Sequence, residues 1–332
     1  MAIAGASSLR GKELKQWLEE GSFPAADVRL LDEEFEAGTL TEAGGEPAVI
    51  QTVDADSFDR VRFAFFTGSP GFSVRHGGEA RGAGATVIDL SGGLVGEPGA
   101  RPWIPPLDEV LPPPAAKAGA VGPRSLFLAP SAPAIIAASL SAALAPLGLN
   151  RLALTFFQPV SERGQEGVAE MESQVVKLLS FEPISQTVFD AQVGFNMMSR
   201  YGEESQEDLA EVRKSIIGEV RANLAGRAAL PAITLVHAPV FYSHTFSAYG
   251  EFAQAPALEE VVGRLQAAGL KVAGEGEASP SNVNVAGEAR PVLARPERDL
   301  SIGCGVWFWG AADNLRAPVA NAVAIAEKLL AS

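Results

Sequence analysis

The sequence predicts an α/β protein whose two halves have different sheets. The chain has 332 residues, a length that fits one large domain or two of medium size. In the first 130 residues, short apolar runs alternate with helical patterns, an order typical of a parallel sheet with helices on both faces. Beyond residue 130 the apolar runs are longer and fewer helices separate them, which favours a mixed or antiparallel sheet.

The first half contains five short apolar runs that are typical of buried strands. The expected strands are residues 2–4, 28–31, 63–66, 86–90 and 126–128, with a helix at 12–20. The Gly- and Pro-rich stretch 92–123 is expected to form irregular surface. An uncharged run follows at 132–149, but its prolines, serines and many alanines favour a buried core helix over a membrane span.

The second half alternates longer strands with acidic helices. The expected strands are residues 152–160, 233–240 and 306–309, and the expected helices are residues 207–220, 257–268 and 314–330. Trp307, Phe308 and Trp309 alternate across the last strand, so we expect them in the core or in a dimer interface.

The composition excludes several classes of function. The net charge of −14 and the scattered basic residues argue against nucleic acid as a partner. One cysteine, Cys304, excludes an internal disulfide and a zinc site of several thiolates, and with three histidines we expect no metal site. Arg10, Lys12 and Glu13 interrupt the apolar start, so we expect no signal peptide, no membrane association and a cytoplasmic protein.

A glycine-containing loop follows the first strand. In Rossmann-type folds such a loop lets the backbone approach a pyrophosphate at a helix N-terminus. Gly5 and Gly11 fit this pattern, whereas Ser8 stands where the spaced form has its middle glycine, and Ser7 lies between them. A tight turn that binds no ligand explains the loop equally well. Gly68, in the segment FTGSPG, is expected in the same cofactor pocket or in a simple turn.

An acidic cluster follows about twenty residues later. Asp32 is placed to hold a ribose hydroxyl pair, and Glu33, Glu34 and Glu36 would repel a 2′-phosphate. The sequence therefore favours NAD over NADP. A solvated acidic helix start, with no dinucleotide bound, is the alternative.

Several longer strings, taken together, resemble the aspartate-semialdehyde dehydrogenase family. They are GASSLRGKEL at 5–14, VIDLSGG at 87–93, FQPVSERGQEG at 157–167, HAPVFYSH at 237–244 and ADNLRAPVANAVAIAEKLL at 312–330. The resemblance implies a Rossmann-type NAD(P)-binding domain at 1–130, completed by a C-terminal helix at 314–332, and an α+β dimerisation domain at 131–313. It also implies a homodimer or a higher even oligomer, and it places Asn314 near the cofactor.

The family's reaction is the NADP-dependent reductive dephosphorylation of an acyl phosphate through a cysteine thioester. The string that matches the family's nucleophile motif is APSAPA at 129–134, and Ala132 occupies the cysteine position. A methyl group cannot form a thioester. Ser131 is expected to cap the following helix rather than to act as a nucleophile. Cys304 is expected to be a buried, inert thiol in an apolar strand.

The resemblance also assigns the remaining site positions. His244 matches the catalytic histidine and Gln158 the active-site glutamine, although both residues could serve packing alone. His237 and Val95 stand where the family has arginines that bind the substrate's carboxylate and phosphate.

Two more contacts with substrate are assigned by the same resemblance. Glu211 and Lys214 are the expected acidic and basic contacts. Asp313 and Asn314 are expected to cap the last helix.

These replacements leave three functional hypotheses. The first is a dimeric binding or regulatory paralogue that has lost the dehydrogenase activity and pairs with itself or with an active relative. The second is an active oxidoreductase that uses His244 and NAD on a different carbonyl substrate, because hydride transfer to a ketone needs no covalent nucleophile. The third is an assembly partner whose second-domain sheet forms the interface.

Overall fold

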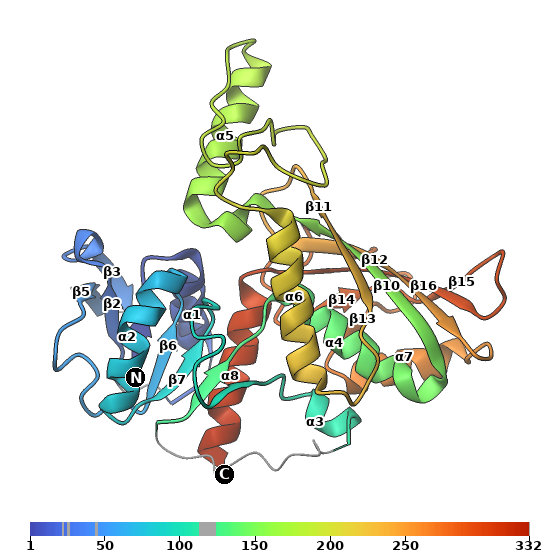
Figure 1. The fold of residues 1–332 in the computed structure, drawn as a ribbon, viewed down its shortest axis with the longest axis horizontal. Coiled ribbons are helices and arrows are strands. Elements are labelled where there is room, and N and C mark those ends of the chain that lie inside the picture. The colour runs from blue at the N-terminus through green and yellow to red at the C-terminus, as the bar shows by residue number, and fades with distance from the viewer. Residues whose placement is uncertain (22, 25–26, 44–45, 113–123, 332) are drawn as a thin grey trace. The chain divides into compact units, whose positions relative to one another are not determined.

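A computed structural model describes residues 1–21, 23–24, 27–43, 46–112 and 124–331. The chain divides into two compact units (Figure 1). Unit 1 consists of residues 1–105, 114–130 and 318–332, and unit 2 consists of residues 106–113 and 131–317. The C-terminal segment therefore returns to the first unit.

Unit 1 contains a seven-stranded sheet in the order β5-β2-β1-β6-β7-β9-β8, and every pairing in it is parallel. The strands are β1 (Ala2–Ala4), β2 (Arg29–Asp32), β5 (Gln51–Thr52), β6 (Phe63–Phe66), β7 (Thr86–Asp89), β8 (Ala100–Pro102) and β9 (Leu126–Leu128). The strand order reverses between β1 and β6, which is where folds of this kind bind ligands.

Both faces of this sheet are covered. Successive strand residues enter two separate apolar clusters, for example Ile3 in one and Ala4 in the other. The helices of unit 1 are α1 (Leu9–Glu20), α2 (Pro70–Gly82) and α8 (Arg316–Ala331), whose first two residues belong to unit 2. Val323 and Ile325 of α8 lie in the same cluster as Ile3, so the expected packing of the C-terminal helix on the first domain is confirmed.

The stretch 92–123 is more ordered than the sequence predicts. It contains β8 and the short helix α3 (Leu107–Val110), and the side chains of Ile104 and Leu107 are buried. The expectation of irregular surface is therefore wrong for these residues, whereas 113–123 lie outside the described residues. Unit 1 also has a turn of 3-10 helix, η1 (Glu34–Glu36), and a hairpin of β3 (Leu40–Ala43) and β4 (Glu46–Val49).

Unit 2 contains a mixed sheet in the order β11-β10-β12-β16-β14-β13, with β15 also paired to β16. The strands are β10 (Leu149–Gln158), β11 (Ala232–His237), β12 (His244–Phe252), β13 (Lys271–Val272), β14 (Val292–Leu293), β15 (Glu297–Arg298) and β16 (Gly305–Ala312). β10 pairs parallel with β11 but antiparallel with β12, so the predicted mixed sheet is confirmed.

The central strand β12 was not predicted from the sequence. Its buried face is built by His244, Phe246, Ala248, Gly250 and Phe252, so small and polar residues interrupt the apolar alternation. β12 forms antiparallel ladders with both β10 and β16. Tertiary packing, rather than a local pattern, therefore defines this strand.

One face of the second sheet is packed by helices and the other is open. Helix α4 (Ala132–Leu144) is buried at every residue and contacts β10, α6 (Leu209–Leu224) and α7 (Leu258–Ala267). The uncharged run is thus a core helix, as predicted. No helix among the described residues has both the length and the apolar character that a membrane span requires.

Helix α5 (Gly164–Leu179) projects from unit 2 and carries a long loop at 180–208 (Figure 1). Two buried polar side chains of α5 organise this loop. Glu170 accepts hydrogen bonds from the amides of Thr187, Val188 and Phe189 at 2.7 to 3.3 Å, and from the Thr187 hydroxyl at 2.9 Å. Gln174 bonds four further backbone groups, those of Ser185, Ala191, Val193 and Gly194.

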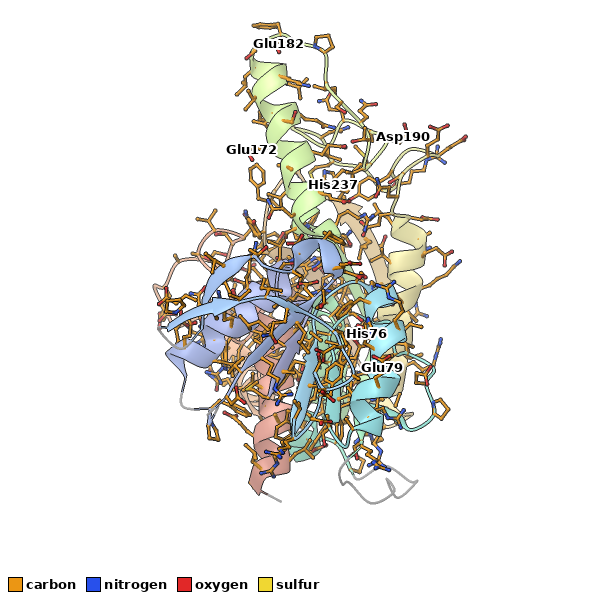
Figure 2. The ribbon with its side chains drawn as sticks, turned by 90° about the vertical axis from the view of Figure 1, so that its left-hand side faces the viewer. His76, Glu79, Glu172, Glu182, Asp190 and His237 are labelled. Carbon is orange, nitrogen blue, oxygen red and sulfur yellow. The ribbon has the colours of Figure 1, made fainter. Side chains whose placement is uncertain are left out.

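Replacing Glu170 with alanine is expected to destabilise this region. Three amides and a hydroxyl would lose their acceptor, and each buried donor left unsatisfied costs about 1–3 kcal/mol. We expect the free energy of unfolding, measured in urea, to fall by about 3 kcal/mol or more, and amide exchange at 187–189 to accelerate. The matched control is Glu172→Ala, because Glu172 is an exposed carboxylate of the same helix (Figure 2). Equal effects of the two substitutions would contradict this account.

Candidate functional site

The first candidate site lies in unit 1, where two loops touch. Gly5 adopts a φ of +96°, and a Cβ at this position would lie 2.1 Å from the backbone nitrogen of Gly68. The β1–α1 loop and the β6–α2 loop are therefore in direct backbone contact, at the point where the strand order reverses. Gly11 approaches equally closely, because its Cβ would lie 2.3 Å from the carbonyl oxygen of Gly5.

Ser8 serves the fold of this loop. Its hydroxyl accepts a hydrogen bond from the Gly11 amide at 2.9 Å and so caps α1. The same hydroxyl lies within donating distance of two carbonyl oxygens, 2.7 Å from that of Gly5 and 2.8 Å from that of Thr67. The serine at the position of the middle glycine is thus a helix cap that joins the two loops.

Asp32 is nearly buried at the end of β2, with 6% of its surface exposed. One of its carboxylate oxygens accepts from the Ser7 amide at 2.7 Å, and the other accepts from the Glu33 amide at 2.9 Å. Asp32 therefore fastens the glycine loop to the end of β2. The acidic residues after it begin η1, which is the short helix that the alternative interpretation expects.

A cavity of about 330 Å³ opens beside this acidic strand end. Its lining consists of Asp32, Glu33, Glu34, Thr52, Val53, Phe72 and His76. His76 and Glu79 lie on α2 (Figure 2), and the His76 Nδ1 atom is 2.8 Å from a Glu79 oxygen. Glu33 forms an ion pair with Arg75, also on α2. Three of the lining residues could not be predicted from the sequence, because no local motif marks Thr52, Phe72 or His76.

The second candidate site lies in unit 2, at one edge of the mixed sheet. Gln158 is the last residue of β10 and pairs with His237, the last residue of β11. His244 begins the antiparallel strand β12 and pairs with Ala312 at the end of β16. The topology therefore brings three of the predicted positions, far apart in sequence, to the same edge.

His244 is buried and forms a pair with a carboxylate. Its Nε2 atom lies 3.1 Å from the Glu162 Oε1 atom, and its ring packs edge-on against Phe156. Within the described residues, the Nδ1 atom of His244 has no hydrogen-bond partner. Glu162 belongs to the short helix η3 (Val160–Arg163). A carboxylate on one nitrogen orients the ring and leaves the other nitrogen available to a ligand.

Asn314 supports this pair from the end of β16. Its amide donates to Glu162 at 3.1 Å, and its carbonyl accepts from the Ser243 amide at 2.9 Å. The expectation that Asn314 caps the last helix is therefore wrong, since these bonds occupy its side chain. Asp313 does cap that helix, because it accepts from the amides of Leu315 and Arg316 at 2.9 Å each.

Gln158 holds a second, partly buried carboxylate. Its Nε2 atom donates to Glu207 at 2.8 Å, and its Oε1 atom is buried with no partner in the described part of the chain. Burial, and then the negative charge of Glu162, raises the pKa of Glu207 to about 7. Burial and Glu207 likewise raise the pKa of Tyr201. Sequence reasoning missed Glu162, Tyr201 and Glu207 as site residues.

The raised pKa of Glu207 predicts a dependence of stability on pH. In the unfolded chain this carboxyl titrates near its ordinary pKa of 4.5, and in the folded chain it titrates at about 7. Between these values the folded state binds more protons than the unfolded state. Glu207 therefore contributes at most about 3 kcal/mol to the free energy of unfolding. This contribution is complete below pH 4.5 and is lost as the pH rises through 7. Urea unfolding at pH 5 and pH 8 should show a larger loss for the wild type than for Glu207→Gln. Identical losses would contradict it.

His237 is enclosed by the long loop at 180–208, called here the arm loop. Its Nδ1 atom lies 3.2 Å from the Tyr201 hydroxyl, and its Nε2 atom lies 3.1 Å from the Val193 carbonyl oxygen. The residue has no exposed surface, and burial lowers its pKa, which favours the neutral ring (Figure 2 labels its position). Met198 pairs with His237 through the backbone in the same loop. This histidine thus joins β11 to the arm loop.

The nucleophile position of the family motif is occupied by a buried alanine. Ala132 is the first residue of α4 and is fully buried. Ser131 occupies the cap position, but its hydroxyl accepts no capping hydrogen bond, so the predicted side-chain cap is wrong. Instead the hydroxyl and the amide of Ser131 both donate to Glu219 on α6, at 2.7 and 2.8 Å. A carboxylate, rather than the helix amides, attracts this hydroxyl.

Cys304 differs from its expected environment. It is half-buried and lies in the turn before β16, so the expectation of a buried thiol within the strand is wrong. His244 pairs with Ala312, whereas Glu251 pairs with Gly305 at the opposite end of the same ladder. Seven residues along a strand span about 23 Å. The thiol therefore lies far outside bonding distance of anything held at His244.

The other predicted substrate positions are exposed at the surface. Glu211 and Lys214 form an ion pair with each other, and about two thirds of each side chain is exposed. Val95 is exposed in unit 1. Among the described residues, no group of three or more His, Cys, Asp and Glu side chains is arranged to hold a metal ion.

Comparisons with known proteins identify the family. The model of the semialdehyde dehydrogenase NAD-binding domain matches residues 1–111, and that of the semialdehyde dehydrogenase dimerisation domain matches residues 140–317. A USG-1 protein homolog of Pseudomonas aeruginosa is 32% identical over 99% of this chain and 97% of its own. Aspartate-semialdehyde dehydrogenase 2 of Vibrio cholerae is 28% identical, with the same coverage.

A solved structure agrees with these matches. That of a probable aspartate-semialdehyde dehydrogenase from Pseudomonas aeruginosa superposes with a TM-score of 0.86 at 30% identity, covering 99% of this chain and 97% of that one. The chain therefore belongs to the semialdehyde dehydrogenase family.

Proposed function

We propose that this chain is a dimeric, dinucleotide-binding member of the family that has lost the covalent dehydrogenase chemistry and serves as a binding or regulatory protein. The observation that carries the proposal is the absence of a thiol at the site. Ala132 fills the nucleophile position, and Cys304, the only cysteine, lies about 23 Å along the β12–β16 ladder from His244. Without a thiolate, the thioester on which the family reaction depends cannot form.

The replaced arginine positions support the same proposal. Relatives of this chain carry the name aspartate-semialdehyde dehydrogenase, and such a substrate bears a carboxylate. His237 is enclosed, and both of its ring nitrogens already have partners within the chain, so it offers that carboxylate no free donor. Val95 offers no charge to a phosphate, and the Glu162 carboxylate lies beside His244. An anionic substrate would therefore be bound poorly.

Intact-mass spectrometry tests the loss of covalent chemistry directly. The protein is incubated with aspartate semialdehyde and either NAD⁺ or NADP⁺ in the absence of phosphate, conditions under which an acyl-enzyme would accumulate. We expect no acyl adduct on the wild type or on Cys304→Ala. An adduct on the wild type that is absent from Cys304→Ala would overturn the proposal, and an adduct on both would indicate a different nucleophile, with Ser131 the first residue to examine.

For the cofactor we propose NAD. The loop at Gly5 leads into the N-terminus of α1, where backbone amides favour a pyrophosphate, and the acidic cavity offers acceptors for a ribose hydroxyl pair. Gly5, Ser7, Gly11 and Gly68 would line the pyrophosphate, and Glu33 would face the ribose. Titration calorimetry should detect NAD⁺ binding, with NADP⁺ weaker. Absence of binding by both at millimolar concentration would remove the cofactor from the proposal.

We propose that the open face of the unit 2 sheet forms a homodimer interface. Trp307 and Trp309 project from β16 on this face, with 45% and 37% of their surfaces exposed, while Phe308 between them is buried. Phe157 contacts Trp309, and Tyr249 contacts Trp307. A row of aromatic side chains on an uncovered sheet is typical of an interface. The same face would serve a mixed dimer with an active relative, which light scattering of the two proteins together would detect.

A second function is favoured by one observation, the His244–Glu162 pair. Reduction of a neutral aldehyde or ketone needs a hydride and a proton, but no thiol. A bound reduced nicotinamide would supply the hydride to the carbonyl carbon. His244, as the imidazolium whose Nε2–H is held by Glu162, would supply the proton to the carbonyl oxygen from Nδ1, the atom that has no partner in the described structure. NADH oxidation with a panel of uncharged carbonyl compounds tests this function, and loss of that rate in His244→Ala would support it.

A further inference from the structure

An arginine side chain beside the acidic cavity of unit 1 forms an ion pair with one of the carboxylates that line the cavity. Glu33 lines the cavity beside Asp32 and Glu34. Its carboxylate forms an ion pair with the guanidinium of Arg75, which comes from α2, the helix that also supplies Phe72 and His76 to the lining. The guanidinium therefore lies at the rim of the cavity, against one of the lining residues.

Asp32 and Glu33 have separate roles in this cavity. Both oxygens of Asp32 accept backbone amides, from Ser7 and Glu33, so its side chain is committed to the loop. The Glu33 carboxylate instead bonds a side chain, and 29% of Glu33 is exposed. Glu33 therefore lines the cavity and also occupies the guanidinium of Arg75.

We propose that Glu33 determines cofactor specificity through its ion pair with Arg75. An isolated arginine at this rim would be a good partner for a phosphate monoester, because guanidinium and phosphate form charge-assisted bidentate hydrogen bonds. Paired with Glu33, Arg75 offers a phosphate no net charge. The cavity thus rejects a 2′-phosphorylated ribose and accepts an unmodified one. This inference rests on the proposed binding of a dinucleotide in unit 1.

The geometry distinguishes this mechanism from simple repulsion by the acidic cluster. Glu34 lines the same cavity, and Glu34→Gln removes the same unit of charge while leaving the Glu33–Arg75 pair intact. Repulsion alone predicts that Glu33→Gln and Glu34→Gln increase the affinity for a 2′-phosphate by similar factors. Neutralisation of Arg75 predicts a gain only when Glu33 is replaced, and only while the arginine is present.

Titration calorimetry of the full chain with 2′,5′-ADP tests the proposal, with 5′-AMP as the ligand that lacks the 2′-phosphate. We expect Glu33→Gln to bind 2′,5′-ADP about tenfold more tightly than the wild type or more, since a hydrogen bond between charged groups is worth about that factor. The double variant Glu33→Gln/Arg75→Gln should return to the wild-type value, and Glu34→Gln should gain no more than about threefold from one distant charge. The affinity for 5′-AMP is measured for the same four proteins, so that any lost contact to the ribose is separated from the change at the 2′-phosphate. The expected tenfold change is in the ratio of the two affinities.

Three results would overturn the proposal. They are an equal gain for Glu34→Gln, a gain that persists without Arg75, and no measurable 2′,5′-ADP binding by Glu33→Gln at millimolar concentration. The probe carries no nicotinamide, so the outcome is separate from that of the NAD⁺ titration. If NAD⁺ fails to bind while Glu33→Gln binds 2′,5′-ADP through Arg75, the proposed cofactor is wrong but the role of Glu33 stands.

Discussion

Replacing Gly5 with alanine should unfold unit 1 or abolish dinucleotide binding there. The new Cβ would lie 2.1 Å from the Gly68 nitrogen and 2.3 Å from the Gly68 Cα, and both are backbone atoms that cannot move aside. The φ of +96° adds strain for any L-residue. We expect the free energy of unfolding to fall by about 3 kcal/mol or more. Urea unfolding monitored by circular dichroism measures this loss.

Gly78→Ala is the matched control for that substitution. Gly78 lies on an exposed turn of α2, and a Cβ added there meets no atom within 4 Å. Alanine is favoured over glycine in a helix by about 1 kcal/mol, so this variant should be slightly more stable than the wild type. A Gly5→Ala protein as stable as the wild type would show that the two loops do not touch as described.

Placing arginine at both Trp307 and Trp309 should convert the proposed homodimer to a monomer. Both residues are partly exposed on the open face of the unit 2 sheet, so the folded protomer tolerates a polar side chain there. Two buried, unpaired charges in the interface of each protomer would cost more than a typical dimer can sustain. The expected result is a halved mass in multi-angle light scattering, with the circular dichroism spectrum of a folded protomer. The unfolding midpoint should fall somewhat, because the two indoles also donate hydrogen bonds to Asp299 and to the Pro280 carbonyl.

Val74→Arg is the control for the dimer experiment. Val74 is an exposed apolar residue on α2 of unit 1, outside the sheet. The Val74→Arg substitution should leave the mass measured by light scattering equal to that of the wild type. A doubly substituted protein that stays dimeric would place the interface on another surface.

The fold could be predicted where the sequence carries local periodicity. The buried strands β1, β6 and β9 match their expected bounds, because short apolar runs bounded by turn residues mark them. β12 could not be found in this way, because His244, Ala248 and Gly250 occupy its buried face and only long-range pairing with β10 and β16 defines the strand. Similarly, β8 lies within a Gly- and Pro-rich stretch that local propensity assigns to loops.

The unit 2 site was predictable only in part. Family motifs indicated Gln158 and His244, and the topology does bring them to one sheet edge. Glu207 was not singled out, since its role follows from a hydrogen bond to Gln158 across 49 residues and from burial. Ser131 shows a further limit of local rules. Its position indicates a helix cap, yet Glu219, 88 residues away, accepts its hydroxyl.

The central claim is that this family member carries no thiol-dependent dehydrogenase activity. The most direct measurement is the phosphate-dependent formation of NADH or NADPH from aspartate semialdehyde, with the Vibrio cholerae relative assayed in parallel. Ala132 and the distant Cys304 predict no rate above the protein-free background with either cofactor. A phosphate-dependent rate that saturates with aspartate semialdehyde and scales with the concentration of this protein would contradict the claim.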